Sequence, residues 1–522
     1  MPRKLPFGIT DKILDEALDA MVGAIGKRWV LRDAKSVAGY RDSYSILDPD
    51  HFVASAAVAP ANVEEIQKLL QIANQYRIPM SPISGGRNQG YGGPAPRLPG
   101  SVMLDLKRMN RILEVNEEFG YALVEPGVSY MDLYEYLQEN DIKLWLDVPA
   151  AGWGSVLGNT VDRGVGYTPY GDHFSMQCGM EVVLANGDVV RTGMGALPGN
   201  NTWQLFKYGF GPYLDGIFTQ SNFGVVTKLG IWLMPEPPGY RPIMITVPRE
   251  EDLEALVDIM LPLKVSMVIP NAAVMASLLF EGAIKSTKKQ YYAGEGPLPD
   301  SAAKKMMADH KIGMWNFYAA LYGPDKIMDA SWEVIRDAFS NIPGAKFYLR
   351  EDREGDIAME YRTKLMSGVP NLTEFTNMNW VDGGGHVDFT PVSPTNGAEA
   401  LKQYAMIHDR VREFGFDYFG LFIVGWRELH HILVLIFRYL DKQEREKARE
   451  LFGILIEEAA REGYGEYRTH LAYMDQIAAT YNWNDNSLMR LNETIKDAVD
   501  PNGILAPGKS GIWPKHLRGK GL

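Results

Sequence analysis

The chain has one cysteine, Cys178, among its 522 residues. A single thiol excludes an intramolecular disulfide and most metal–thiolate sites. Its surroundings, Ser175-Met-Gln-Cys-Gly-Met-Glu181, are typical of a buried filler rather than a nucleophile. We therefore expect no metal site.

Long hydrophobic runs and excess positive charge are also absent. The first residues, Met1 to Gly8, lack the apolar core of a signal peptide, and the most apolar late run, Ile432 to Phe437, is far too short to span a bilayer. The net charge of -12 argues against nucleic acid and anionic membrane surfaces, because both would be repelled. We expect a cytoplasmic protein with neither a nucleic-acid nor a membrane partner.

Two nucleotide-binding patterns can be set aside. The dinucleotide fingerprint GxGxxG occurs nowhere in the chain. The segment Gly503 to Ser510 matches the phosphate-loop pattern GxxxxGK[ST], but it follows a Pro-Asn-Gly turn and precedes only 12 residues. No helix is expected there to present its N-terminus to a phosphate, so we do not predict a nucleoside triphosphatase.

The composition is that of a globular chain with more than one domain. A hydrophobic content of 46% supports large cores, and the length allows two to four domains. A proline cluster at Met234 to Tyr240 marks one boundary, and the sequence changes character again near Tyr464 to His470. Between them, helical runs such as Lys326 to Phe339 alternate with strands such as Ile243 to Val247.

The segment Ser84 to Gly93 contains five glycines around one arginine and one tyrosine. An apolar run, Phe52 to Ala59, precedes a helical pattern capped by Asn62, and Arg77 to Ser84 then resembles a second strand. The glycine loop thus leaves the carboxyl end of a buried strand, where open α/β sheets bind ligands. Glycines let successive N–H groups approach one anion, although a plain surface turn is an equal alternative from this loop alone.

Several long motifs in other parts of the chain are distinctive when taken together. They are Trp153 to His173, Arg191 to Ala196, Tyr208 to Pro212, Gly463 to His470 and Pro501 to Trp513. In these segments the chain resembles, nearly end to end, the vanillyl-alcohol oxidase and eugenol oxidase family of flavoproteins.

The resemblance implies an α+β fold of two domains. An FAD-binding domain is made from both chain ends, residues 1–238 and 467–522, and an α/β substrate cap, residues 239–466, is inserted between them. The cofactor positions implied by the resemblance are Ser84, Gly85, Gly86, Arg87, Asn88, Gly158, Asn159 and Val225, with Lys509 near the flavin.

His386 follows three glycines in Gly383-Gly-Gly-His386-Val-Asp388-Phe-Thr-Pro391, where backbone and imidazole can approach a flat ligand. By itself a histidine is more often structural. The resemblance implies that His386 bonds covalently to the 8α-methyl group of the FAD. His51 resembles a histidine that assists this attachment in one relative, and a surface-turn histidine is an equal alternative for it.

Tyr91, Tyr467 and Arg468 match the phenolate-binding residues of the family. Hydride leaves a benzylic carbon readily only if the para oxygen is anionic. Ionising a phenol near neutral pH requires a pKa shift of about three units, or roughly 4 kcal/mol. One guanidinium and two hydroxyl donors, at roughly 1.5–3 kcal/mol per charge-assisted bond, supply that amount.

The sequence departs from the family at two positions of the expected substrate pocket. Ala150 stands where relatives carry a catalytic aspartate, and Leu421 stands where eugenol oxidase carries a glutamine. Asp147 matches a separate acid of the family and is no replacement. The loss of the aspartate casts doubt on hydration activity, and Thr390 is expected to complete this pocket.

We therefore predict an FAD-dependent oxidase of para-substituted phenols that uses molecular oxygen. Two alternatives stay open: a dehydrogenase of the p-cresol type that passes electrons to a cytochrome, and a flavin-binding homologue with little turnover, as Ala150 suggests. The segment Ala196 to Tyr208 lacks the long insertion of the octameric relative, so we expect a homodimer.

Overall fold

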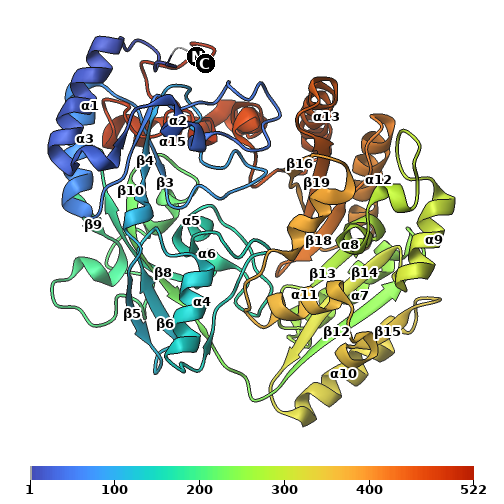
Figure 1. Cartoon of the computed structure of the whole chain (residues 1–522). Helices are drawn as coiled ribbons and strands as arrows, with labels where there is room; N and C mark the ends of the chain where they lie inside the picture. The colour runs from blue at the N-terminus through green and yellow to red at the C-terminus, as the bar shows by residue number, and fades with distance from the viewer. Residues whose placement is uncertain (1–2) are drawn as a thin grey trace.

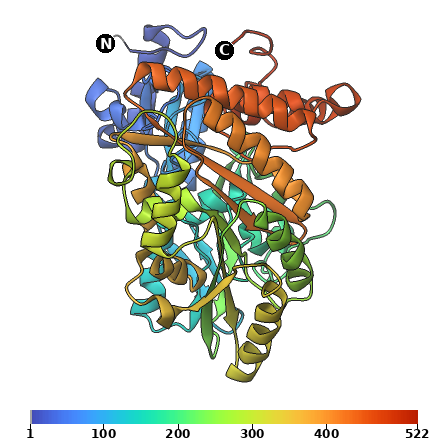
Figure 2. The same ribbon diagram turned by 90° about the vertical axis from the view of Figure 1, so that its right-hand side faces the viewer.

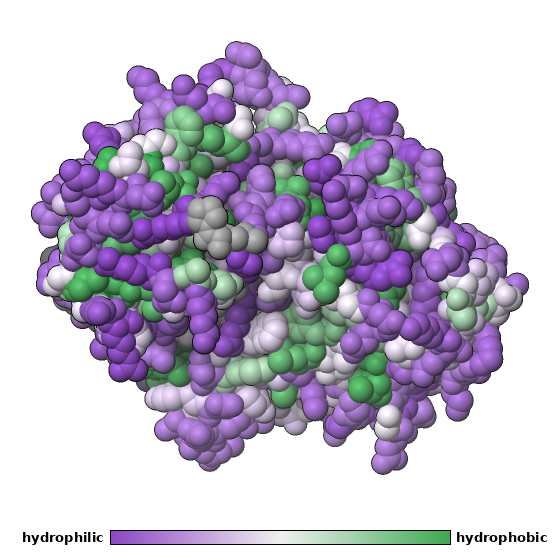
Figure 3. Space-filling view, turned by 45° about the horizontal axis from the view of Figure 1, so that its top comes forward, coloured by the Kyte–Doolittle hydropathy of each residue, from purple (hydrophilic) through white to green (hydrophobic). Residues whose placement is uncertain are grey.

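The structure is a computed structural model and describes residues 3–522. It consists of two lobes lying side by side, with both ends of the described chain at the top of the molecule (Figures 1 and 2). The surface shown in Figure 3 is mainly hydrophilic, with apolar residues in small groups. No helix within the described residues is both long and apolar enough to cross a bilayer.

Three sheets form the first lobe: one with the strand order β1-β2-β4-β3, one with the order β5-β6-β10-β8-β9, and a two-stranded sheet of β11 and β7. Its strands are β1 (Val30–Leu31), β2 (Ala56–Val58), β3 (Met80–Ile83), β4 (Val102–Asp105), β5 (Ile112–Asn116), β6 (Tyr121–Val124), β7 (Leu144–Trp145), β8 (Gln177–Val183), β9 (Val189–Arg191), β10 (Val225–Trp232) and β11 (Met234–Pro235). Its helices are α1 (Asp11–Ile25), α2 (Ala34–Val37), α3 (Val63–Tyr76), α4 (Tyr130–Glu139), α5 (Val156–Val161) and α6 (His173–Met176).

The predicted strand, helix and strand around α3 are present. The Asn62 side chain caps α3 by accepting a hydrogen bond from the backbone N–H of Glu65, and Ile66, Leu69 and Leu70 bury the apolar face of the helix. The strands β2 and β3 do not pair directly, because β4 lies between them and is parallel to both. The glycine loop leaves the carboxyl end of β3, as predicted.

The second lobe is an antiparallel sheet with the order β15-β12-β14-β13-β18-β19-β16, to which β17 adds by pairing with β19. Its strands are β12 (Tyr240–Val247), β13 (Val274–Ser277), β14 (Trp315–Tyr322), β15 (Lys346–Leu349), β16 (Gly384–Phe389), β17 (Val392–Pro394), β18 (Gly420–Val424) and β19 (Glu428–Arg438). Its helices are α7 (Asp252–Val265), α8 (Leu278–Lys285), α9 (Asp300–His310), α10 (Asp325–Phe339), α11 (Ile357–Met366), α12 (Gly397–Glu413) and α13 (Lys442–Arg461).

Alternation along these strands separates the two faces of the second sheet. Phe422 and Val424 of β18 pack in the core formed with α7, α10, α12 and α13, which cover one face (Figures 1 and 2). Leu421 and Ile423 point to the opposite face, toward the first lobe. The strand period therefore places an apolar face of this sheet at the junction of the lobes.

The last part of the chain returns to the first lobe through α14 (Met474–Thr480) and α15 (Trp483–Val499). The backbone N–H of Met80 donates to the carbonyl of Ile504, and that of Ala506 donates to the carbonyl of Met80. Lys496, fully buried on α15, donates to Asp500 and to the carbonyls of Asn222 and Leu505. These bonds fix the segment beyond residue 500 to strand β3.

Candidate active site

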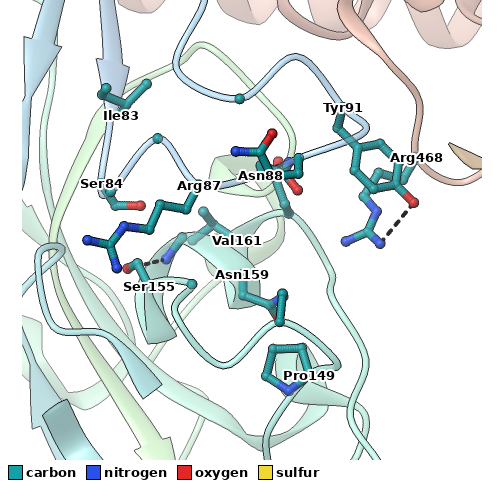
Figure 4. A pocket seen from close by; sticks show the side chains of 18 of the residues that line it. Ile83, Ser84, Arg87, Asn88, Tyr91, Pro149, Ser155, Asn159, Val161 and Arg468 are labelled. Carbon is teal, nitrogen blue, oxygen red and sulfur yellow. Dashed lines mark hydrogen bonds between the residues drawn. The ribbon is translucent and has the colours of Figure 1, made fainter. Parts of the chain in front are cut away.

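A cavity of about 370 Å³ lies between the lobes. The first lobe contributes the glycine loop, part of α5, the start of β10 and Leu505, Ala506 and Lys509 from the end of the chain. The second lobe contributes strands β16, β18 and β19. Figure 4 shows Ser84, Arg87 and Asn88 on one side of this space, with Tyr91 and Arg468 facing each other at another.

The glycine loop and α5 approach each other too closely for side chains. A Cβ atom at Gly158 would lie 2.2 Å from the Ser84 hydroxyl, and Gly86 has a φ of 63°. The Ser155 side chain caps α5 by accepting from the N–H of Gly158. Both backbones can therefore contact the same elongated ligand, such as the dinucleotide FAD.

Nine of the predicted cofactor positions of the first lobe line this cavity: Ser84, Gly85, Gly86, Arg87, Asn88, Gly158, Asn159, Val225 and Lys509. The tenth, His51, does not. Asp162 accepts a hydrogen bond from Asn88 and pairs with Lys509 at 3.2 Å. The phosphate-loop pattern requires a helix that begins near Lys509. The structure has only a 3₁₀ turn of three residues there, η10 (Lys509–Gly511), so the match to that pattern is false, as expected.

His386 is buried at the wall of the cavity. Its Nδ1 lies 2.7 Å from Asp388 Oδ1, and its Nε2 is buried without a hydrogen-bond partner. Burial opposes protonation of the ring, but the Asp388 carboxylate outweighs it and raises the pKa of His386. A Cβ atom at Gly90 would lie 2.6 Å from the imidazole Cε1, so this glycine leaves the space that the ring occupies.

His51 lies outside the lining of the cavity. His51 is exposed in a turn. Its backbone N–H donates to the carbonyl of Asp48, and its imidazole ring lies edge-on to the Phe52 ring. No hydrogen bond joins His51 to His386 in the part of the chain that is described. This placement favours the surface-turn alternative.

Arg468 and Tyr91 meet inside the cavity, and Tyr467 lies beside them. Arg468 Nη2 donates to the Tyr91 hydroxyl at 3.1 Å (Figure 4). The Arg468 guanidinium lies 4.2 Å from the Tyr91 ring and 5.5 Å from the ring of Tyr467, which is not among the residues that line the cavity. The Tyr467 hydroxyl and Arg468 Nε are both buried without a partner. Burial raises the pKa of Tyr91 well above 10 although Arg468 opposes it, so this hydroxyl stays neutral and can donate.

The opposite wall is apolar. It is formed by Leu421 and Ile423 of β18 and by Ile432 and Val434 of β19, which come from the sheet face directed at the first lobe. Ala150 also lines the cavity. Thr390 does not line it; its hydroxyl instead donates to the Arg468 carbonyl at 2.7 Å and positions that residue from behind.

Asp147 is engaged in the interior of the first lobe. Its carboxylate lies 2.6 Å from His173 Nε2 and accepts from the N–H of Thr168. His173 Nδ1 in turn lies 2.6 Å from the side-chain oxygen of Asn159. Asp147 therefore supports the cavity wall through Asn159 and does not replace the aspartate missing at position 150.

Sequence reasoning missed the wall made by η8 (Thr373–Trp380). Glu374, Phe375 and Met378 all line the cavity. Burial raises the pKa of Glu374, with Arg362 opposing, and the Tyr361 hydroxyl donates to its carboxylate. No periodic pattern marks η8 in the sequence. For the apolar wall, the sequence offered the strand alternation of Ile432 and Val434, besides Leu421, which was predicted from the family resemblance.

Cys178 is buried as predicted, and burial raises the pKa of its thiol to about 12. No group of histidine, cysteine and acidic side chains within residues 3–522 is suited to hold a metal ion.

Comparisons with known proteins agree with this geometry. Residues 54–193 match the FAD binding domain family, and residues 271–510 match the C-terminal domain of FAD linked oxidases. The chain is 44% identical, over 97% of both chains, to the 4-cresol dehydrogenase [hydroxylating] flavoprotein subunit of Pseudomonas putida.

Two solved structures are similar over nearly their whole length. One is 4-ethylphenol oxidase from Gulosibacter chungangensis in complex with isoeugenol, with a TM-score of 0.97, 43% identity and coverage of 98% of this chain and 100% of that one. The other is p-cresol methylhydroxylase with substrate bound, with a TM-score of 0.96, 44% identity and coverage of 98% and 99%. These matches confirm the predicted α+β fold of an FAD-binding domain with a cap domain.

With a cofactor cavity between two such domains and this similarity along the whole chain, the protein belongs to the vanillyl-alcohol oxidase and p-cresol methylhydroxylase family, FAD-dependent enzymes that oxidise para-substituted phenols.

Proposed function

We propose that this enzyme binds its phenol as a phenolate between Tyr91, Tyr467 and Arg468 and uses dioxygen as its electron acceptor. The observation that carries the phenolate site is the convergence of one guanidinium and two tyrosines, in which the Tyr467 hydroxyl and Arg468 Nε lack partners. Buried donors without acceptors cost free energy unless a ligand satisfies them. A phenolate oxygen would accept from all three side chains.

The protein groups hold the negative charge and leave the benzylic position facing the apolar wall. FAD, when bound, supplies the acceptor for the benzylic hydride. The substrate then becomes a quinone methide. The quinone methide formed from a 4-hydroxybenzyl alcohol loses its hydroxyl proton to give the aldehyde. The quinone methide formed from a 4-alkylphenol either adds water to give an alcohol or loses a β-proton to give an alkene.

Dioxygen is favoured over a cytochrome by His386. In the family that the chain resembles, dehydrogenases of the p-cresol type use a tyrosine as the flavin anchor, whereas this chain has the histidine of the oxidases, His386. Oxygen consumption with vanillyl alcohol tests the assignment, with formation of hydrogen peroxide as the expected product. Turnover only with an added one-electron acceptor would favour the dehydrogenase, and no turnover with either would favour a flavin-binding homologue.

We also propose that His386 carries the FAD covalently. The support is that Nδ1 of His386 is hydrogen-bonded to Asp388. In the neutral ring Nδ1 then carries the proton, and the lone pair of Nε2 is free to attack the flavin. Acid-precipitated protein should stay yellow, and His386→Ala should release free FAD. Complete loss of flavin from fully loaded wild-type protein on acid precipitation would refute the linkage.

A homodimer is the third part of the proposal. The loop from Leu197 to Leu214 presents a group of exposed apolar side chains, among which Phe210 is fully exposed; the others are Leu197, Phe206, Tyr208, Tyr213 and Leu214. Contiguous exposed apolar groups of this kind mark interfaces, and a symmetric dimer would bury the patch twice. The choice between dioxygen and a cytochrome as electron acceptor does not depend on this surface.

The domain limits 1–238, 239–466 and 467–522 remain our proposal for the folding units. They are supported by the bonds between Met80 and residues 504–506 and by β12, which starts the second sheet at Tyr240. Limited proteolysis should first cut near residues 235–240 and leave the last segment bound to the first lobe.

A further inference from the structure

A second cavity, of about 360 Å³, lies beside the active-site cavity. It is lined by Tyr44, Trp153, Leu372, Phe375, Met378, Asn379, Gly383 and Gly384. Phe375 and Met378 also line the active-site cavity, so the two spaces share these side chains as a wall. We call this second space the outer cavity.

The outer cavity is open to solvent on its far side. Leu372 has an exposed fraction of 36%, and Asn379 and Gly383 are also exposed. A small molecule can therefore enter it from the surface without passing through the active site.

Its lining suits a neutral aromatic ring. Trp153 and Phe375 lie with ring centroids 5.0 Å apart, and Tyr44 contributes a third aromatic ring. Aromatic side chains interact favourably with a planar ring in stacked or edge-on arrangements. None of the eight lining residues is ionised at neutral pH, since burial raises the pKa of Tyr44, the one titratable group among them. The Tyr44 hydroxyl and the Asn379 amide belong to lining residues and are neutral hydrogen-bonding groups.

The shared wall is carried by an unusual element. η8 is a 3₁₀ helix of eight residues, and runs of this type longer than three or four residues are uncommon because their hydrogen bonds are poorly aligned. Gly383, with a φ of 67°, follows this helix before β16 begins. The wall between the cavities is therefore made by two side chains on an element with weak internal bonding.

We propose that the outer cavity is a second binding subsite for phenols, which takes the neutral ring before it passes the side chains of Phe375 and Met378. This inference rests on the proposed function, because it assumes that the inner cavity binds phenols. The chemistry divides between the sites: the outer site offers aromatic surfaces and only neutral polar groups, whereas the inner site offers the guanidinium of Arg468, which favours the phenolate.

The test uses crystals of the FAD-loaded enzyme soaked with 4-bromophenol, which has no benzylic hydrogen and whose bromine can be located by anomalous scattering. We expect one bromine in each cavity. Equilibrium dialysis in solution should give two bound molecules per chain, so that binding is established outside the crystal as well.

Three variants make the test specific. Trp153→Ala removes one aromatic face, and Leu372→Arg places a charge at the exposed mouth without changing a buried side chain. Each should weaken the outer site by roughly tenfold or more and leave one bound molecule per chain. Phe119→Ala is the matched control, because Phe119 is an exposed aromatic residue in the turn after β5 and should leave both sites intact.

The outcomes separate the two proposals. Bromine in the inner cavity alone, with one molecule bound in solution, would overturn the outer subsite and leave the proposed function standing. Bromine in the outer cavity alone would support an outer phenol site but overturn the proposed phenolate site. Bromine in neither cavity would overturn both.

Discussion

Ala150 and Leu421 leave one wall of the active site without hydrogen-bonding groups. Burial of a methoxy group against such a wall is worth on the order of 1 kcal/mol, whereas a carboxylate there would be desolvated at a cost of roughly several kcal/mol. We therefore expect this enzyme to accept phenols with bulky or paired methoxy substituents of the syringyl type. Without a carboxylate at position 150, water at this wall is poorly activated, which forfeits about 10² or more in proton transfer.

The Ala150→Asp variant tests this wall. It should lower turnover of syringyl alcohol and shift 4-ethylphenol products from alkene toward alcohol, as measured by product chromatography. Ala150→Asn is the matched control, because it has the same size but no basic carboxylate and should change syringyl turnover alone. An aspartate that altered neither quantity would show that this wall has no such role.

Arg468 provides the charge that the phenolate needs. Arg468→Lys keeps that charge but loses the forked donors, and it should lower kcat/KM roughly 10²-fold, equivalent to about 3 kcal/mol. The pH at which kcat/KM reaches its maximum should also rise, because more of the phenol must ionise in solution before binding. The pH profile with vanillyl alcohol measures both effects, and Arg412→Lys, on α12, serves as the control. An unchanged profile would exclude Arg468 from ionising the substrate.

The raised pKa of His386 predicts how covalent attachment depends on pH. Only the neutral ring offers the Nε2 lone pair, so attachment should be slow below the raised pKa and should accelerate as the pH rises through it. Reconstitution of flavin-free protein with FAD, followed by acid precipitation, measures the rate on both sides of the ordinary histidine value of about 6.5. Asp388→Asn removes the carboxylate and should move the transition to lower pH; a transition that did not move would contradict this cause.

Among the secondary-structure elements, α15 joins the last part of the chain to the cavity. Lys496 and Asp500 are both almost fully buried, and Asp500 also accepts from the N–H groups of Ile504 and Leu505. Burial lowers the pKa of Lys496 despite its partner Asp500. Removing the lysine would leave a buried carboxylate without a cation, which costs about 3–5 kcal/mol.

The Lys496→Met variant should therefore unfold at a lower denaturant concentration and bind FAD more weakly, since Leu505, Ala506 and Lys509 line the cofactor cavity. Chemical denaturation and flavin titration measure the two effects. Lys515→Met, at an exposed position of the same terminal segment, should be neutral. Equal stability of the two variants would show that the buried pair does not hold this segment in place.

For the whole molecule, the loop from Leu197 to Leu214 decides the oligomeric state that we propose. Phe210→Ser should weaken the dimer and yield monomer in light scattering at low protein concentration, because a fully exposed aromatic anchor at an interface typically contributes more than 1 kcal/mol. Trp483→Ser is the control, since Trp483 is 82% exposed but lies outside this loop. A stable octamer in the unchanged protein would contradict the proposal at the outset.

Local sequence was sufficient for elements whose signals are short-range. The Asn62 cap and the apolar spacing after it predicted α3. The five glycines were equally compatible with a ligand-binding loop and a surface turn, and the loop lines the cavity. The motifs that resemble the flavoprotein family led to the correct fold, and the cofactor positions that they imply line one cavity, with the exception of His51. These features can be predicted from the sequence because helix capping, the helical period and a positive φ depend on neighbouring residues alone.

The tertiary structure decided what depends on residues far apart in the chain. It placed β4 between the two strands that flank α3, left His51 outside the cavity, and put Thr390 behind Arg468 instead of in the pocket. It also brought η8 to the cavity wall, where Phe375 and Met378 separate two spaces. Strand order and cavity walls arise from packing between distant segments, and no local period or spacing records which segments will meet.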